Sequence, residues 1–333
     1  IIAGTHYDGW YWDGAGSIHH PPQDERRTIL SLAENTITFE PLTFDHKRAR
    51  DHDSIPVANM TRSVTFNTSD PTCPVHRRPH VMIMDGATSI RGAAFVGMGR
   101  TDKSVPAVDV ATLQAPQPCD QTGAQYCACG GDCVTPVSNI KGRYPLHLHH
   151  AAQGGEIVGC VVDRSPGWGI AHHNCDARID ENVVYGCLGA GIVGETGNET
   201  GSWNGNAVIF CKGHNGQSSK DGNDLNGEAF DMGRTGDGYW FQGRMIQAHD
   251  NVAVSCRTGF TFMHRGTGMI DVEPSQTDHG QNYFGQRITP DHVPIQHFED
   301  NLAVACIYGM HVTKAGPRQG HGLRTVMKRF TSW

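Results

Sequence analysis

The sequence lacks any apolar run of 18 residues, so no stretch of it has the length and composition of a transmembrane helix. It has few long runs of one charge and almost no heptad-like stretches, which together with 41 glycines favours a turn-rich β protein. Its net charge of -7 argues against nucleic acid as a partner, because phosphate binding needs clustered Lys and Arg. No signal peptide precedes Ile1, so we expect a mature or excised piece of a longer product.

The chain is rich in histidine and cysteine. At 333 residues it is long enough to bury a substantial core in one domain. Its 20 histidines are the main groups that titrate near neutral pH. Eleven cysteines and three Asn-X-Ser/Thr triplets favour an extracellular, secreted glycoprotein with disulfide bonds. The triplets predict glycosylation at Asn59, Asn67 and Asn198.

The first third of the chain divides into an N-terminal segment and a series of short strands. Residues 1–34 are aromatic and polar, and we expect them to form a cap or entry loop. From residue 35 onward, alternating apolar and polar residues predict half-buried strands. These strands are expected at residues 36–39, 42–44, 62–66, 81–84 and 90–95.

Residues 101–139 interrupt this pattern, with four prolines and little periodic hydrophobicity. We expect an inserted loop held by disulfides among Cys119, Cys127, Cys129 and Cys133. A four-cysteine zinc knuckle is the alternative, although the spacing lacks the paired Cys-x2-Cys steps that such sites use.

After residue 150 a repeat appears that predicts the fold. Asn182, Asn206, Asn251 and Asn301 each open a six-residue segment that ends in cysteine. Their steps of 24, 45 and 50 residues are interpreted as one, two and two coils of about 22–25 residues. This pattern predicts an all-β, right-handed parallel β-helix over residues 35–333. We expect the asparagines to form a hydrogen-bonded ladder at a turn. A leucine-rich repeat is excluded because its Leu-x-x-Leu-x-Leu frame is absent.

The cysteines that end these segments recur at one phase of the repeat. We expect Cys187, Cys211, Cys256 and Cys306 to stack as small buried hydrophobic residues. Cys187 and Cys211 in particular are predicted to remain thiols, and a disulfide between neighbouring coils is the alternative.

Histidines and one carboxylate recur at coil spacing. His147 and His149 are two residues apart, so on a strand both project from one face. His172 and Glu195 follow His149 at steps of 23 residues. We therefore predict a divalent metal ion, zinc or calcium, bound by His147, His149 and His172, with Glu195 as acid or base. The alternative is a surface histidine stack without metal, and the pattern does not decide whether His172 or His173 faces the site.

The segment Gly142–His149 closely resembles the Gly-Arg-Tyr-Pro-(Ile/Val)-His-Phe-His motif of a G8-associated family. That family includes the cell migration-inducing and cell-surface transmembrane hyaluronidases and the fibrocystin-like proteins. Similar segments occur in the same order at 41–46, 60–66, 80–84 and 90–99, so the resemblance covers roughly residues 35–310. The chain departs from the pattern at residues 172–175 and at Thr196, where the family more often has a carboxylate.

The resemblance implies an extracellular β-helix protein that acts on or binds an acidic polysaccharide with metal assistance. Arg143 is the candidate to neutralise a substrate carboxylate, beside Glu195 as acid or base. The sequence does not choose between a hydrolase and a lyase. The alternative function is a non-catalytic structural or adhesive component of an extracellular matrix or surface filament, with other extracellular proteins as partners.

Overall fold

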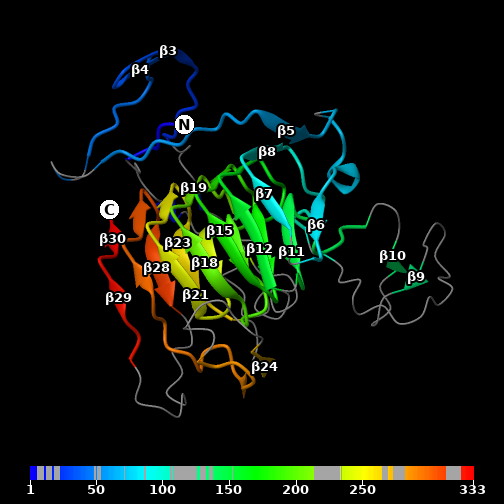
Figure 1. Cartoon of the computed structure of the whole chain (residues 1–333). Coiled ribbons are helices and arrows are strands. Elements are labelled where there is room, and N and C mark those ends of the chain that lie inside the picture. Colours follow the sequence, from blue (N-terminus) through cyan, green and yellow to red (C-terminus); the bar gives the residue numbers. More distant parts are fainter. Residues whose placement is uncertain are drawn as a thin grey trace.

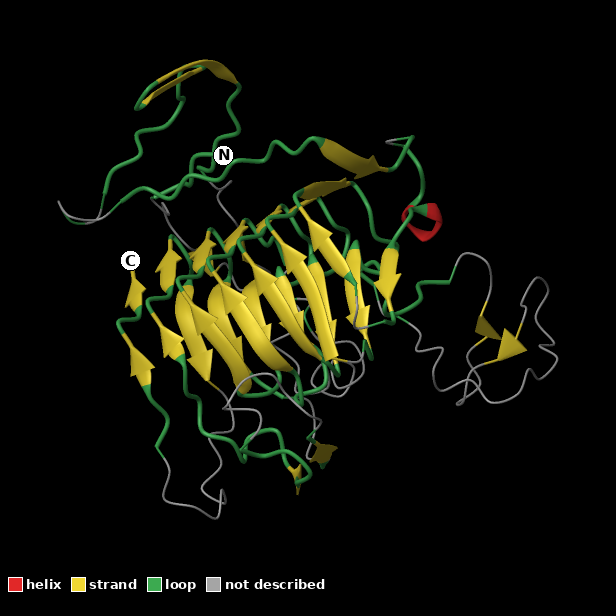
Figure 2. Cartoon of the chain, viewed as in Figure 1, coloured by secondary structure: helices red, strands yellow, loops and turns green. Residues whose placement is uncertain are grey.

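Short parallel strands stacked coil upon coil make up most of the molecule (Figures 1 and 2). The computed structural model describes residues 1–5, 11–12, 17–18, 23–48, 50, 54–70, 72–85, 88–105, 107, 126–127, 133–134, 138–151, 153–213, 233, 235–264, 269–272, 282–312 and 324–333. Three sheets, of seven, seven and eight strands, run along the stack. The predicted all-β parallel β-helix is therefore confirmed.

Each sheet takes one strand from every coil, and we call the sheets A, B and C. Sheet A contains β6 (Val81–Ile83), β11 (Leu146–His149), β14 (Ile170–His173), β17 (Ile192–Gly194), β20 (Asp237–Phe241), β23 (Thr258–Phe262) and β28 (Tyr308–Val312). Sheet B contains β7 (Ser89–Arg91), β12 (Gln153–Val158), β15 (Asp176–Asp180), β18 (Thr200–Asn204), β21 (Met245–His249), β26 (Phe298–Glu299) and β29 (Met327–Lys328). Sheet C contains β5 (Val64–Asn67), β8 (Ala93–Val96), β13 (Val161–Asp163), β16 (Val183–Tyr185), β19 (Ala207–Ile209), β22 (Val252–Val254), β27 (Leu302–Val304) and β30 (Thr331–Ser332).

The remaining elements are four two-stranded antiparallel sheets and a single turn of 3-10 helix in the described part of the chain. The two-stranded sheets are β1 (Tyr11–Trp12) with β2 (Ser17–Ile18), β3 (Ile29–Ala33) with β4 (Thr36–Phe39), β9 (Tyr126–Cys127) with β10 (Cys133–Val134), and β24 (Ile270–Asp271) with β25 (Arg287–Ile288). The helical turn is η1 (Val75–Arg77). No helix in the described ranges is long and apolar enough to cross a membrane.

A column of buried asparagines runs along one corner of the coils, as predicted. The backbone N–H and Nδ2 of Asn182 both donate to Oδ1 of Asn206, at 3.0 Å. Asn206 donates in the same way to Asn251, and Asn251 to Asn301, at 2.9–3.1 Å. Each Nδ2 also donates to a backbone carbonyl, so the column joins both its own members and the neighbouring strands. The ladder fixes the vertical register of consecutive coils.

The residue before each ladder position adopts a left-handed backbone conformation. Glu181, Asp250 and Asp300 have φ of 58°, 56° and 56°, and Gly205 occupies the same place with φ of 62°. Glycine and aspartate tolerate this conformation better than most residues. The chain can therefore turn sharply there and present the next asparagine inward.

The number of coils between ladder positions differs from the sequence interpretation. Because β19 pairs directly with β22, and β22 with β27, the steps of 45 and 50 residues each span one coil. The extra residues fall in the chain between β19 and β20 and between β23 and β26. The prediction of two coils per step was therefore wrong, since long excursions and additional coils lengthen a repeat equally.

The interior between the three sheets is apolar and stacked. Tyr239 lies on Phe260 with ring centroids 4.8 Å apart, and Phe241 lies on Phe262 at 4.5 Å. These separations match the spacing of hydrogen-bonded strands, so each aromatic ring covers the ring of the next coil. The cysteines that recur in the repeat are free thiols in this interior, as predicted for Cys187 and Cys211, with Cys256 fully inside and Cys306 partly so.

The outer face of sheet C is covered by the first residues of the chain. Ile1 and Ala3 pack with Ala58 against outward-facing aliphatic side chains of this sheet. Ile2 forms antiparallel bridges with Glu25 and Val57. We call residues 1–5 the N-terminal strap. The predicted division at residue 34 falls in the turn of the β3–β4 hairpin and stays a prediction.

Removal of one ladder asparagine should destabilise the whole stack. Asn251→Ala removes the acceptor of the buried Asn206 backbone N–H and of one Asn206 Nδ2 hydrogen, and it removes the donor to the Trp203 carbonyl, so we expect a loss of about 2–3 kcal/mol of unfolding free energy. Asn67→Ala, at an exposed position, is the matched control and should change stability by less than about 0.5 kcal/mol. Urea unfolding measures both; equal stabilities of the two variants would contradict the role of the ladder.

Asp24, which accepts a hydrogen bond from Gly4 of the strap, should make the unfolding free energy depend on pH. Burial raises the pKa of Asp24 to about 6, although the Gly4 amide and the Ser255 hydroxyl oppose this shift. The folded state therefore keeps a proton that the unfolded chain releases near its ordinary value of 3.8. The proton on Asp24 stabilises the folded state by up to about 3 kcal/mol. This stabilisation is complete below about pH 4 and is lost as pH rises through 6. In Asp24→Asn that loss should be absent when unfolding is compared at pH 4 and 7.5; identical pH profiles would refute the assignment.

Candidate metal centre

Strands β11, β14 and β17 bring histidines and a carboxylate together on the outer face of sheet A. His149 is the register partner of His173 on the next coil. The backbone N–H of Glu195, directly after β17, donates to the carbonyl of His172, which extends the same pairing to a third coil. His147 precedes His149 by two residues and so projects from the same face. We call His147, His149, His173 and Glu195 the histidine–glutamate cluster.

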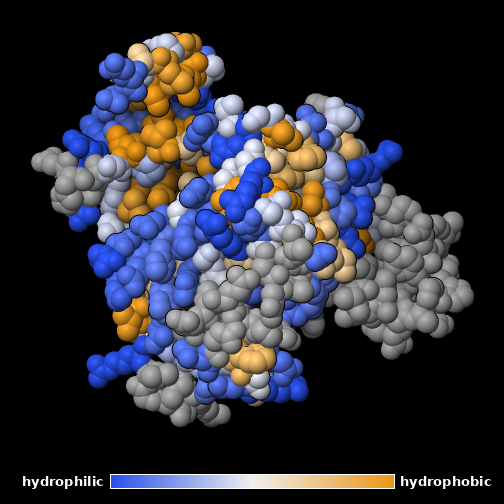
Figure 3. All heavy atoms as spheres, in the orientation of Figure 1, coloured by the Kyte–Doolittle hydropathy of each residue, from blue (hydrophilic) through white to orange (hydrophobic). Residues whose placement is uncertain are grey.

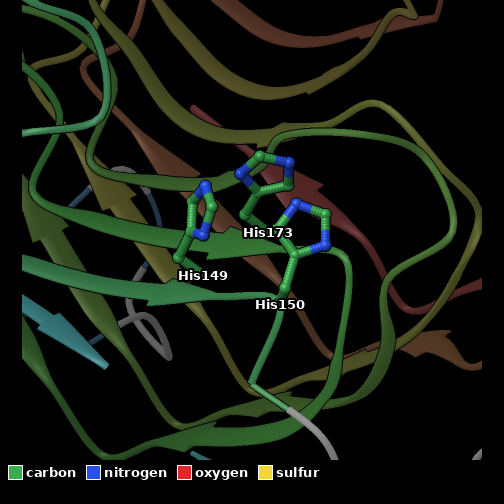
Figure 4. Close-up of side chains that lie close together, drawn as sticks. All are labelled: His149, His150 and His173. Atoms are coloured by element: carbon green, nitrogen blue, oxygen red, sulfur yellow. The ribbon is translucent and has the colours of Figure 1, made fainter. Parts of the chain in front are cut away.

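The cluster is compact. The Glu195 Oε2 lies 3.5 Å from Nε2 of His147 and 3.4 Å from Nδ1 of His173. The rings of His149 and His173 have centroids 4.7 Å apart, and the exposed His150 adds a fourth ring beside them (Figure 4). Within each of the two triads His147–His173–Glu195 and His149–His150–His173, one ligand atom per residue lies within 4.8 Å of the others.

Several ring nitrogens of the cluster are buried and make no hydrogen bond. They are Nε2 of His147, Nδ1 of His149 and Nδ1 of His173. His147 is held from its other side, where Nδ1 contacts the carbonyl of Gly142 at 2.8 Å. A buried polar atom without a partner is costly, so these three ring nitrogens, two of which lie 3.4–3.5 Å from the Glu195 carboxylate, indicate a ligand that is bound by nitrogen.

Burial also keeps these rings in the neutral form. It lowers the pKa of His147 to about 4, although the Glu195 carboxylate and the Gly142 carbonyl oppose the shift. Burial lowers the pKa of His149 and His150 as well, and the neighbouring His173 adds to the effect. Neutral imidazoles have a free lone pair, which is the form that binds a metal ion.

A second carboxylate shapes the loop that carries Glu195. Glu199 is fully buried and accepts hydrogen bonds from the backbone N–H groups of Asn174, Thr196 and Gly197. The side-chain amide of Gln242 donates to the carbonyl of Glu195 at 2.6 Å. The loop is therefore held from both sides. Glu199 has a structural role in this loop that the sequence did not indicate.

His172 does not belong to the cluster, which corrects the predicted ligand set. Its Nε2 contacts the carbonyl of Cys175 at 2.8 Å, and its Nδ1 accepts a hydrogen bond from Trp203 at 3.2 Å. It is 0% exposed and faces the interior. His173 takes its place, because the coil from His149 to His173 has 24 residues and not 23. A one-residue shift on a strand moves a side chain to the opposite face.

The signal that identifies His173 was present in the sequence. Leu146 and Ile170 are the first inward residues of their strands and are register partners. Aligning the apolar positions of the two segments, instead of averaging the spacing, places His149 opposite His173. The missed residue therefore follows from the apolar alternation.

Arg143 lies just before β11, and its backbone N–H donates to Thr101 Oγ1. Its positive charge acts on His80: burial, Arg100 and Arg143 together lower the pKa of His80 to about 4. A contact between Arg143 and a substrate carboxylate stays a prediction.

The predicted modification sites fall into different environments. Asn59 and Asn67 are exposed, as glycosylation requires. Asn198 is 7% exposed, and its Nδ2 donates to Asn174 Oδ1 and to the carbonyl of Asp271, which disfavours a glycan on that nitrogen. The structure therefore argues against modification at Asn198 in the folded chain.

The predicted disulfide loop is mostly outside the described residues, including Cys119 and Cys129. Cys127 and Cys133 are backbone register partners in the β9–β10 sheet. Disulfides among these four cysteines stay predictions.

Comparison with known proteins gives one distant relative. No family model matches the chain. A G8 domain-containing protein of Dictyostelium discoideum is 28% identical over 146 residues, which is 43% of this chain and 7% of that protein. The chain thus spans a small part of this relative's length. It is a parallel β-helix protein with a distant, partial similarity to a G8 domain-containing protein.

Proposed function

We propose that the histidine–glutamate cluster binds a divalent transition-metal ion and that the surface around it binds an acidic polysaccharide. The observation that carries the proposal is the set of three buried ring nitrogens without hydrogen-bond partners, of which those of His147 and His173 lie 3.5 and 3.4 Å from the Glu195 carboxylate. Three imidazoles and one carboxylate are a donor set typical of zinc. Calcium, the other ion expected from the sequence, prefers six to eight oxygen ligands and fits this donor set poorly.

The residues of the chain hold the donors in place before any ion arrives. Gly142 fixes the ring of His147, and the loop of Glu195 is held by Glu199 and Gln242. Little side-chain ordering would then oppose binding. A bound ion would supply Lewis acidity toward a sugar oxygen or a uronate carboxylate.

An acidic polysaccharide is supported by three observations. The strand that carries His147 and His149 has the motif that resembles the hyaluronidase group. His149 and His150 are partly and largely accessible, so a polymer can reach the outer side of the cluster. The similarity to a G8 domain-containing protein agrees with this resemblance. An extracellular location follows as part of the same proposal.

The type of reaction is restricted by the carboxylates. Most glycosidases use two carboxyl groups that flank the scissile bond. In the described part of the chain, Glu195 is the one carboxylate of the cluster, since Glu199 is occupied with three backbone N–H groups. Glu195 is therefore better suited as a metal donor than as the acid or base assigned from the sequence. Cleavage would depend on the metal ion, and a chain that binds without cleaving would be the adhesive component.

Metal content tests the first half of the proposal. We expect about one zinc ion per chain after dialysis against dilute zinc at pH 7.5, measured by inductively coupled plasma mass spectrometry. His147→Ala and His173→Ala each remove a donor and should weaken zinc binding by at least about tenfold, with circular dichroism unchanged.

His311→Ala is the matched control, because His311 is exposed and lies on β28 of the same sheet. It should keep its zinc. Absence of zinc from the unsubstituted chain, or an equal loss in His311→Ala, would contradict the metal centre.

Polymer binding tests the second half. Incubated with hyaluronan, chondroitin sulfate, polygalacturonate and neutral dextran, the chain should retard only acidic polymers in affinity electrophoresis. A chelator should abolish the retardation because it removes the ion, and His149→Ala should weaken it because it removes one donor. New reducing ends or a chain-shortened polymer would assign an enzyme, and retardation without shortening would assign an adhesive protein. No retardation of any acidic polymer would refute the proposed partner.

A further inference from the structure

A large apolar groove lies between the β3–β4 hairpin and a floor formed by residues 55–61 and the first two residues of the strap. It has a volume of about 1230 Å³, and its apolar lining includes Ile29, Leu32, Ile37, Leu42, Phe44 and Val57. The hairpin stands away from the stacked coils in Figure 1, and Figure 3 shows hydrophobic side chains both on it and in the recess beneath it. We call this feature the hairpin groove.

The side chains of the groove are far more exposed than apolar residues of a closed core. Leu32 is 70% exposed, Val57 69% and Ile37 55%. Six apolar side chains that are each about half exposed leave on the order of 500 Å² of apolar surface uncovered, taking roughly 180 Å² for a side chain of this size. A patch of this size is at the upper end for a monomer and marks an interaction surface.

The charged groups around the groove are neutralised within the chain. Arg26 pairs with Asp163 at 2.9 Å, and Arg27 and His46 both contact the carboxylate of Glu25. The rim therefore presents no uncompensated arginine or carboxylate from these groups to an ionic partner. The occupant must be recognised by apolar contact.

The size of the groove favours a polypeptide over a small ligand. Small-molecule pockets have volumes of about 300–1,000 Å³ and enclose most of the ligand. A standard protein interface instead buries about 800 Å² on each partner, of which the apolar part is about 500 Å². The uncovered apolar surface of the hairpin groove is of the same order.

The two walls of the groove are both largely apolar. One wall is the projecting hairpin, and the other is the floor around Val57. Strands β3 and β4 pair only with each other, so in the described structure the outer edge of each has no strand partner. A surface that carries both a projecting element and a recess can pair with itself about a two-fold axis.

We propose that the hairpin groove is the interface of a two-fold dimer of this chain. The apolar face of the hairpin of one copy lies on the groove floor of the other, and the reverse contact completes the pair. This arrangement covers Leu32 and Ile37 of each copy against Val57 of its partner copy. It leaves the histidine–glutamate cluster, which lies on sheet A, outside the interface.

Sedimentation equilibrium of the full chain tests the proposal with two matched variants. Leu32→Asp places a charge in the groove and should raise the dimer dissociation constant by at least about tenfold. Leu30→Asp, at a position on the same strand that is 62% exposed but does not line the groove, should leave the dimer intact. A monomer at every concentration, or equal dissociation of both variants, would overturn the proposal.

Cross-linking between copies identifies the contact. One tagged chain carries Ile37→Cys, and a differently tagged chain carries Val57→Cys. The two are mixed and treated with a short bis-maleimide. We expect more mixed-tag dimer than unsubstituted chains give under the same treatment. If the mixed-tag dimer does not exceed that level, the proposed arrangement is wrong. A monomer that floats with phosphatidylcholine vesicles, and loses this property in Leu32→Asp, would assign the groove to a lipid surface instead.

Discussion

The hydrogen-bonded column of asparagines is the constraint on which the other features depend. Each member uses its acceptor for the coil before it and its donors for the coil after it, so no member can shift alone. A shift of one residue would leave buried donors and acceptors without partners and reverse the face of every side chain in the coil. The register of sheet A, and with it the meeting of His149, His173 and Glu195, follows from this column.

The cluster illustrates how a solenoid builds a site from few residues. Its members come from three consecutive coils, and each is placed by backbone pairing and not by a long loop. Burial prevents protonation of His147 near neutral pH, and Gly142 orients its ring. The donor atoms are thus arranged by the fold itself, and the loop around Glu199 only limits how far Glu195 can move.

The sequence predicted the fold well because its strongest signals are periodic. The repeated asparagines, the valines after them and the buried cysteines each have one structural role per coil, so their phase is visible without coordinates. The site was predicted less precisely, because a mean step of 23 residues conceals one coil of 24 and one of 22. That difference moved the ligand from His172 to His173. Excursions such as the one before β20 were also invisible, since an inserted loop and an additional coil lengthen a repeat equally.

The N-terminal strap changes what kind of solenoid this is. Coils that touch only their neighbours open one at a time from an end, and their stability is a sum of local terms. Here Ile1 and Ala3 of the strap belong to an apolar cluster that reaches Val304 on β27. The segment bonded to the strap adds further contacts: Asp24, which accepts a hydrogen bond from the Gly4 N–H, interacts with Ser255 just after β22, and Arg26 is bonded to Asp163 on β13. A coil in the middle of the stack cannot unfold without breaking the contacts between the strap and the remaining coils. The stack is therefore coupled across its length, and its unfolding becomes a collective event instead of a fraying process.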